Sequence, residues 1–362
     1  MNNQEEELRG IRYKTEQIDE AVAGKTLDNT LSVLRGCLEK SFISQSEKGI
    51  EIPAGAMNAL SANLKTICSI FLPHFSNADS LALKYQFRYK LGSKLIYLLS
   101  ALAVIAVTAQ SLFSSLPHEI VLIEIVCIAV ILIIIKYGNS LGWHRRWLDY
   151  RMLAELFRFA VFMAMAGEKA SVNIPGRSLY DAGNKKDWIF ARFSDVWLQW
   201  QELRLTVPGD ATSIEILKKF ISLAWLEDQR KYHLKNVMRH LQKHKRYSVA
   251  GETLFFLTLI ASVLHYMNIG GHSLGPYLTF LAISMPATGS AFSALRSHFE
   301  HNRLARRSEK MAAYLEELES QLVAVDTIDG LLRIVREAEA LMLNENSEWY
   351  VMIGFRKMET PA

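Results

Sequence analysis

Cysteine is scarce in this sequence, and the first residues carry no hydrophobic run. Three cysteines, Cys37, Cys68 and Cys127, form no CxxC pair, and their odd number argues against a disulfide framework. We therefore expect a reducing compartment. The opening stretch, MNNQEEELRG, is acidic and polar. We expect no cleavable signal peptide, so that membrane insertion would depend on internal segments.

Signatures of catalysis are also missing. The sequence has no phosphate-binding glycine loop, no GxSxG elbow and no HExxH motif, and no acid, base and nucleophile are grouped. The closest approach to a metal motif is His233, His240 and His244, of which the last two are one helical turn apart. Several lysines and arginines accompany them and would repel a cation, so we interpret them as part of a solvated basic helix face. We expect neither an enzyme nor a bound metal or cofactor.

Strong net charge is a further absence. Lysine and arginine total 41 against 37 acidic residues, and the basic residues are spread along the chain. We therefore expect no nucleic-acid partner. Half of the residues are hydrophobic, and the mean hydropathy of +0.09 is too apolar for an ordinary soluble domain and too polar for a compact transporter. The membrane part should be a minority of the chain.

Long hydrophobic runs are what the sequence does contain, and four of them are long enough to span a bilayer. They extend over about 91–113, 120–137, 249–267 and 275–295. The last two are borderline in hydropathy, and a buried core hairpin is the alternative for that pair. Because no segment alternates long enough to predict a sheet, the expected fold is an all-α integral membrane protein.

Positive charge flanks each pair of runs. The basic residues before and after the pairs are Lys84, Arg88, Lys90, Lys94, Lys136, Arg145, Arg146, Arg151, Lys243, Lys245, Arg246, Arg296, Arg303, Arg306 and Arg307. The loops inside the pairs, SSLPHE and NIGGHSLG, contain neither lysine nor arginine. The positive-inside rule then places both loops outside and both termini in the cytoplasm. We expect two transmembrane hairpins, four spans in all, with long cytoplasmic helical extensions.

The two hairpins resemble each other. FRYKLGSKLIYLLSALAV aligns without a gap on KRYSVAGETLFFLTLIAS, which places Arg88 and Tyr89 on Arg246 and Tyr247. Both hairpins would enter from the cytoplasm, so the pattern predicts a parallel internal repeat about an axis normal to the membrane. Chance similarity between hydrophobic spans is the alternative.

These patterns divide the chain into five segments. They are an N-terminal cytoplasmic helical region (1–80), a first hairpin with a cytoplasmic extension (81–166), a cytoplasmic helical region (167–247), a second hairpin with its extension (248–322) and a C-terminal cytoplasmic segment (323–362). Glycine, proline and asparagine predict breaks between helices at KGIEIPAG and at LPHFSNAD.

A few polar or small residues inside the spans are candidates for an ion path or a gate. Glu124 is the only internal charge of the second span, although it lies close enough to the outer boundary to reach the headgroups. The remaining candidates are Thr108, Gln110, Ser262, His265, Pro286 and Gly289. For the polar ones, hydrogen bonding between packed helices is the alternative. For Pro286 and Gly289, which make the fourth span kinked and small, close helix packing is favoured over gating.

A stretch rich in charge and aromatics, WHRRWLDYRMLAELFR, follows the second span. Trp143, Trp147 and Arg151 recur at four-residue intervals, and Glu155 is spaced for ion pairs with Arg151 and Arg158. The neighbouring face is an apolar stripe at helical period, Tyr150, Leu153, Ala154, Phe157, Ala160, Val161 and Ala164. We predict a helix that continues from the span and transmits motion into it. Packing on neighbouring helices alone is the alternative.

Several of these stretches together resemble the SLATT and SMODS-associated four-transmembrane effector families. They are SNADSLALKYQFRYKLGSKLIYLLSALAV, WLDYRMLAELFR, WLQW, QRKYH, MPATGSAF, RRSEKM and EWYVMIGFRKMETPA, and the resemblance covers roughly Ala78 to Ala362. The resemblance implies a bacterial inner-membrane effector of a nucleotide-signalled anti-phage system. In such systems, a second-messenger nucleotide triggers pore formation or membrane disruption that kills or arrests the host.

Relatives in these families often carry a fused nucleotide-binding sensor, whereas the residues before Ala78 contain no phosphate-binding glycine loop. The signal would reach the chain through a separate sensor protein, or the cytoplasmic region would bind the nucleotide itself. Because four spans enclose little volume, we expect homo-oligomers in the lipid bilayer. The alternatives are a membrane-anchored helical scaffold and a small ion channel or transporter unrelated to defence.

Overall fold

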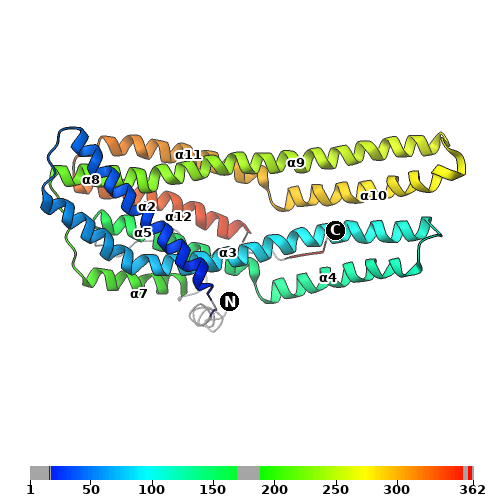
Figure 1. Ribbon diagram of the computed structural model, residues 1–362, viewed down its shortest axis with the longest axis horizontal. Coiled ribbons are helices and arrows are strands. Elements are labelled where there is room, and N and C mark those ends of the chain that lie inside the picture. The colour runs from blue at the N-terminus through cyan, green and yellow to red at the C-terminus, as the bar shows by residue number, and fades with distance from the viewer. Residues whose placement is uncertain (1–15, 17, 169–187, 354–357, 361–362) are drawn as a thin grey trace. The chain divides into compact units, whose positions relative to one another are not determined.

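The structure, a computed structural model, describes residues 16, 18–168, 188–353 and 358–360, with side chains up to residue 345 and again from 358. Every regular element in these ranges is a helix, and they contain no strand (Figure 1). The all-α prediction is confirmed. The chain forms two compact units, each assembled from separated parts of the sequence. We call them the helical unit and the hairpin unit.

The helical unit comprises Met1–Tyr85, Arg145–Tyr232 and Met311–Phe355. Its helices are α2 (Glu20–Glu47), the first part of α3 (Ala54–Leu112), α5 (Trp143–Met165) from Arg145 on, α7 (Trp188–Glu202), α8 (Ala211–Ile221), the end of α11 (His301–Val323) and α12 (Ile328–Ile353). A π-helical turn, Ser222–Leu226, joins α8 to α9 (Glu227–Tyr266). Two aspartates start helices here by accepting backbone N–H groups: Asp19 from Val22, at 3.2 Å, and Asp210 from Ser213, at 2.9 Å.

Aromatic side chains fill the core of the helical unit. Phe162 stacks on Trp225 with ring centroids 4.8 Å apart, and Phe71 lies 5.8 Å from Trp197. The apolar stripe predicted on α5 is buried throughout, which confirms that prediction. Rings of this size bury a large apolar area each, and they account for much of the stability of the unit.

The predicted break at LPHFSNAD is wrong, because α3 continues through Pro73. A proline inside a helix removes one backbone hydrogen bond and costs about 3 kcal/mol. Here the residues around it are tied into the core: Phe71 and Leu72 are almost completely buried, and His74 stacks on Phe157 at 5.2 Å. Packing therefore outweighs the local signal. The break at KGIEIPAG is confirmed, since α2 ends at Glu47 and α3 begins at Ala54.

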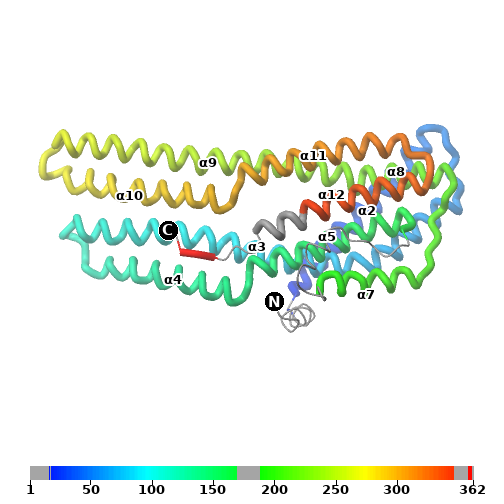
Figure 2. Tube along the Cα trace, turned by 180° about the vertical axis from the view of Figure 1, so that it is seen from behind, coloured from blue at the N-terminus to red at the C-terminus, as the bar shows by residue number. Residues whose placement is uncertain are grey.

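The hairpin unit comprises Gln86–His144, His233–Lys310 and Arg356–Ala362. In it, α4 (Val121–Ser140) lies beside the end of α3, and α10 (Gly271–His298) lies beside the end of α9 (Figures 1 and 2). We call these helix pairs the first and the second hairpin. Among the described residues, four helical stretches are long and apolar enough to cross a membrane, and only 11% to 28% of each apolar window is buried.

A break follows the second helix of each hairpin. The chain turns at Leu141 and Gly142 before α5 begins, with Gly142 at φ +60°, and it turns at Phe299 and Glu300 before α11 begins, with Glu300 at φ +45°. A positive φ ends a helix because it lies outside the right-handed helical region. The prediction that α5 continues from the span is therefore wrong. The helices without a break at the corresponding level are α3 and α9.

Candidate functional site

Tyrosine and histidine side chains gather where the apolar part of the first hairpin ends. Tyr89 of α3 stacks on His144, with ring centroids 4.3 Å apart, and its hydroxyl lies 3.2 Å from Nε2 of His298. The hydroxyl of Tyr97 lies 3.5 Å from Nδ1 of the same histidine. His298 is in the last turn of α10, where the helix dipole favours positive charge. It thus links the two hairpins through two tyrosines.

The second hairpin has a related cluster. Tyr247, which the sequence alignment places on Tyr89, stacks on His301 with centroids 5.8 Å apart. Nδ1 of His301 lies 3.0 Å from Nδ1 of His240. One of these nitrogens donates a proton and the other accepts it, so at least one ring is neutral.

Burial and neighbouring cations keep this histidine pair neutral. Burial lowers the pKa of His240 to about 4, and Lys243, Lys90 and Arg239 add to the shift. The pKa of His301 is also lowered to about 4, first by burial and then by repulsion from His240 and Lys243. Both rings are therefore uncharged at neutral pH, and the hydrogen bond between them is compatible with that state.

The interpretation of the α9 histidines as a solvated face is wrong for two of them. His233 is 6% exposed and His240 is half-buried against α11, because this side of α9 packs rather than faces water. His240 pairs with His301 and not with His244, the residue one turn away. Among the described residues, no group of three or more His, Cys, Asp or Glu side chains is placed to hold a metal ion.

The polar candidates of the first hairpin have local partners. The hydroxyl of Thr108 donates to the carbonyl of Val104 at 2.7 Å, within its own helix. The amide of Gln110 lies 3.3 Å from Nδ1 of His118, across the turn between the helices. Glu124 is half-buried in the first turn of α4, where the helix dipole favours a carboxylate. Their suggested role in an ion path stays a prediction.

The candidates of the second hairpin fall into two groups. Ser262 and His265 are exposed on α9. Pro286 lies inside α10, which stays helical past it, and Gly289 is buried where α9 and α10 approach closely. A Cβ on Gly289 would lie 3.2 Å from the ring of Phe255 and 3.4 Å from the carbonyl oxygen of Gly251. The predicted close packing of the fourth span is confirmed.

The candidates for transmission all lie in α5. Trp143 belongs to the hairpin unit, and Trp147 is buried in the helical unit. Glu155 pairs with Arg158 and lies 4.0 Å from Arg151, which confirms both predicted ion pairs.

Two partners of these charged residues were missed from the sequence. Arg158 donates to the side-chain oxygen of Gln229 at 3.1 Å. The pKa of Asp79 is raised, first by burial and then by Glu155, against the opposing effect of the arginines. Asp79 and Gln229 belong to other helices, so spacing within α5 could not indicate them.

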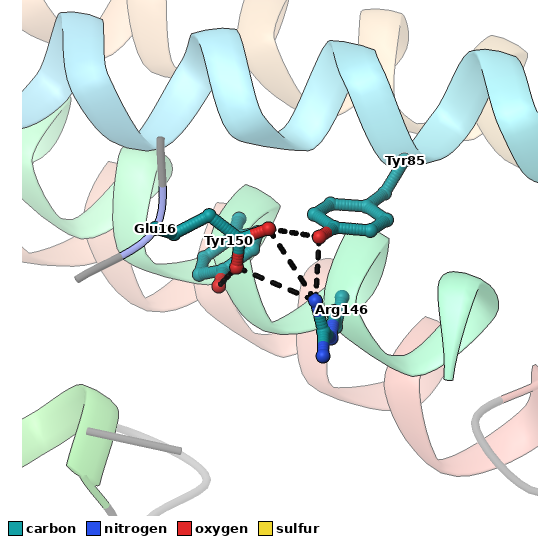
Figure 3. A network of polar contacts seen from close by, with 4 residues as sticks. All are labelled: Glu16, Tyr85, Arg146 and Tyr150. Carbon is teal, nitrogen blue, oxygen red and sulfur yellow. Dashed lines mark hydrogen bonds and ion pairs between the residues drawn. The ribbon is translucent and has the colours of Figure 1, made fainter. Parts of the chain in front are cut away.

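A second polar cluster holds Glu16, which lies four residues before the start of α2. The carboxylate of Glu16 accepts hydrogen bonds from the hydroxyls of Tyr85 and Tyr150, the latter at 2.7 Å (Figure 3). Arg146 lies 3.3 Å from the same carboxylate, and its guanidinium covers the ring of Tyr85. Burial, then hydrogen bonding to Glu16, raises the pKa of both tyrosines, so they stay protonated donors.

This cluster ties Glu16 to α3 and α5 within the helical unit. The sequence offered no signal for Glu16, which lies in an acidic stretch without periodicity. The histidines of the hairpin unit had a weak signal, because His144, His298 and His301 occur at the two helix breaks, in WHRR and in HFEH.

Comparison with known proteins found a family match for one part of the chain. Residues 224–349 match the model of a protein family described as SMODS and SLOG-associating 2TM effector domain 1. The match covers α9, α10, α11 and most of α12, and so contains the whole second hairpin. Neither the comparison with curated proteins nor that with solved structures gave a match. The resemblance to the SLATT effectors is confirmed over this range: residues 224–349 are similar to a two-helix membrane effector domain.

Proposed function

We propose that this protein is a bacterial inner-membrane effector that oligomerises and, when triggered, opens a pore or disrupts the membrane as part of an anti-phage response. The observation that carries the proposal is the match of the second hairpin to an effector domain, in a chain whose hairpins leave apolar surface uncovered. Exposed side chains on them include Leu122, Ile125, Val126, Leu132, Ile133, Phe255, Phe256, Leu259 and Val263. Such a surface is stable in lipid and not in water.

The chain would carry two copies of one membrane module. Adding 158 to the bounds of α5, Trp143–Met165, gives those of α11, His301–Val323, and the same shift places Arg88-Tyr89 on Arg246-Tyr247. It also places the turn at Gly142 on the turn at Glu300. Apart from His301 at its start, the buried residues of α11 all fall on buried positions of α5: Ala305, Ser308, Met311, Ala312, Leu315, Leu318 and Leu322. A parallel duplication accounts for these coincidences.

The remaining parts of the proposal follow from charge and topology. Lysine and arginine concentrate at one end of both hairpins, which supports loops outside and termini in the cytoplasm. The helical unit would then receive the signal, from a nucleotide or a separate sensor protein. Continuous helices α3 and α9, which contribute residues to both units, would pass it on without any catalytic step.

Liposome leakage tests the proposal. The full chain is reconstituted into vesicles of phosphatidylethanolamine and phosphatidylglycerol, and dye release and conductance are recorded with and without candidate cyclic nucleotides. We expect release that rises with the amount of protein and with the activating signal. Correctly inserted protein that stays silent under every condition, while the same chain arrests growth in cells, would rule out the pore.

Replacing the spans separates an effector from an anchored scaffold. A chain whose four spans are exchanged for unrelated apolar helices of equal length keeps the helical unit. We expect it to insert and to lose growth arrest. Preserved growth arrest would favour a scaffold that uses its spans only as anchors.

A further inference from the structure

The C-terminal residues lie against the first hairpin. Met358, Glu359 and Thr360 lie outside any helix and belong to the hairpin unit. Asn139, in the last turn of α4, holds the backbone of Met358 from both sides: its amide nitrogen donates to the carbonyl oxygen at 2.9 Å, and its amide oxygen accepts from the N–H, also at 2.9 Å. An asparagine side chain can satisfy one residue of an extended peptide in this way because it carries both a donor and an acceptor.

A slot for one side chain lies next to this contact. Met358 is 5% exposed, and its thioether rests on two glycines, Gly92 of α3 and Gly138 of α4. A Cβ on Gly138 would lie 2.5 Å from the sulfur, and one on Gly92 would lie 3.3 Å from the terminal methyl. The ring of Trp143 closes a third side, 3.3 Å from both of these Cβ positions. The missing side chains therefore create the space that the methionine fills.

We propose that this slot is a binding site for an extended peptide segment with one unbranched apolar side chain. The chain's own residues Met358–Thr360, the C-terminal strap, occupy it and hold the first hairpin together at the end where α4 meets α5. Methionine suits the slot because its unbranched, flexible side chain adapts to a narrow gap.

In the second hairpin, a side chain of the hairpin itself makes the connection that the strap makes in the first. The shift of 158 that relates the two modules places Gly138 on Arg296. Arg296 donates to the hydroxyl of Ser248 at 2.7 Å, so it joins α10 to α9 with a side chain of the hairpin itself. In the first hairpin, a separate segment makes the equivalent connection. Two neutral hydrogen bonds and one buried side chain hold it, and such contacts are individually weak. The strap can therefore leave its site without the hairpin unfolding.

Hydrogen exchange tests whether the strap is bound. The full chain in lipid nanodiscs is compared with Asn139→Ala, which removes the amide contact, and with Gly138→Leu, which fills the slot and favours the helix. Ser140→Ala is the matched control, because Ser140 is exposed one residue away. We expect exchange of the Met358 amide to be slowed by about tenfold or more in the wild type and the control, and to lose that protection in both other variants.

Peptide binding tests the chemistry of the site. A labelled peptide with the sequence FRKMETPA is titrated into a chain that ends at residue 357. We expect saturable binding that is lost when the peptide's methionine is replaced by aspartate and when the truncated chain carries Gly138→Leu. An unprotected Met358 amide in the wild type, or equal protection in all variants, would overturn the proposal, as would peptide binding that ignores both changes.

Vesicle leakage tests whether the strap restrains the hairpin, and only this arm rests on the proposed function. We expect Asn139→Ala and the chain ending at residue 357 to release dye without a signal at least about threefold faster than wild type, with Ser140→Ala unchanged. If wild type leaks when triggered but these variants stay silent without the trigger, the restraint is refuted. If nothing leaks under any condition, the pore fails, and the exchange and peptide results alone decide the binding site.

Discussion

The two hairpins differ at Gly138 and Arg296, two positions that a shift of 158 residues aligns. The first has Gly138, and the gap above it is filled by Met358 from the far end of the chain. The second has Arg296, which reaches Ser248 on the partner helix. The two hairpins thus close in different ways. The second is closed by its own side chains, and the first depends on a segment that can be removed.

The largest expected difference in stability is between two glycine-to-leucine variants, one in each hairpin. Gly289→Leu pushes a side chain against the ring of Phe255 and the backbone of Gly251, which cannot move without separating α9 from α10. We expect a loss of about 3 kcal/mol of unfolding free energy, typical of an overpacked contact. Gly138→Leu meets the flexible end of Met358 and the ring of Trp143, and it should cost less because Met358 can move aside. Thermal unfolding in detergent measures the loss of stability in both variants. Equal losses would contradict the proposed difference between the two hairpins.

The helices after the hairpins, α5 and α11, should respond differently to loss of a carboxylate. Glu155→Ala leaves Arg151 and Arg158 without their common partner in a partly buried site. We expect a loss of about 2 kcal/mol, between the values for exposed and buried ion pairs. The matched control is Glu309→Ala in α11, an exposed position that corresponds to Arg151 and should cost less than about 0.5 kcal/mol.

Denaturant titration measures the stabilities of these two variants, and growth arrest in cells tests the transmission role of α5. We expect Glu155→Ala to reduce growth arrest and Glu309→Ala to leave it intact. If Glu155→Ala keeps full growth arrest and assembly, α5 does not transmit the signal.

Acid should weaken the second hairpin through its histidine pair. The folded-state pKa values of His240 and His301 are lowered to about 4, below the ordinary value of 6.5. The unfolded chain therefore binds more protons than the folded chain, and the stabilisation present above pH 6.5 is lost as the pH falls toward 4. We expect a smaller effect than in the two preceding cases.

The measurement is Tm between pH 7 and 4 for the wild type and for His301→Asn. The variant should show a flatter decline, whereas His272→Asn, an exposed position at the start of α10, should follow the wild type. Identical curves for all three proteins would mean that the pair does not contribute.

The two variants with the smallest expected loss of stability compare most directly how each hairpin is held together. Ser248→Ala removes the acceptor for Arg296, and we expect a loss of about 1 kcal/mol or less. Asn139→Ala should cost a similar amount. Only the latter should raise unstimulated dye release, because only the latter frees a segment. Equal release from both variants would make the hairpins equivalent.

Features with a local cause could be predicted from the sequence. The four apolar runs, the buried stripe of α5 and the ion pairs of Glu155 depend on spacing within one helix. Gly289 could be identified because a small residue in a span indicates a close helix contact. Pro73 misled the prediction because its local cost is outweighed by packing around Phe71 that no local pattern reveals.

The missed contacts all join residues far apart in the chain. Glu16 meets Arg146 across 130 positions, and Asn139 meets Met358 across 219. The partner of His240 lies 61 positions away on another helix. Such pairs depend on how helices pack, and one sequence without related sequences holds no signal for them. The proposed strap belongs to this class, since neither Asn139 nor Met358 is unusual in its local surroundings.

The π-helical turn at Ser222–Leu226 changes the sequence spacing of the buried positions along this helix. An α-helix advances about 100° per residue, and a π turn accommodates one extra residue in a single turn. The buried positions Ile214, Leu217 and Ile221 before it, and Gln229, His233 and Asn236 after it, are therefore offset in sequence by one step. Deleting one residue of this turn would therefore restore a regular α-helix and keep the buried face of α9 where it is. The same deletion within the regular part of α9 would turn the residues beyond it by about 100°. At this point the chain tolerates a change of length that it would not tolerate elsewhere in the helix.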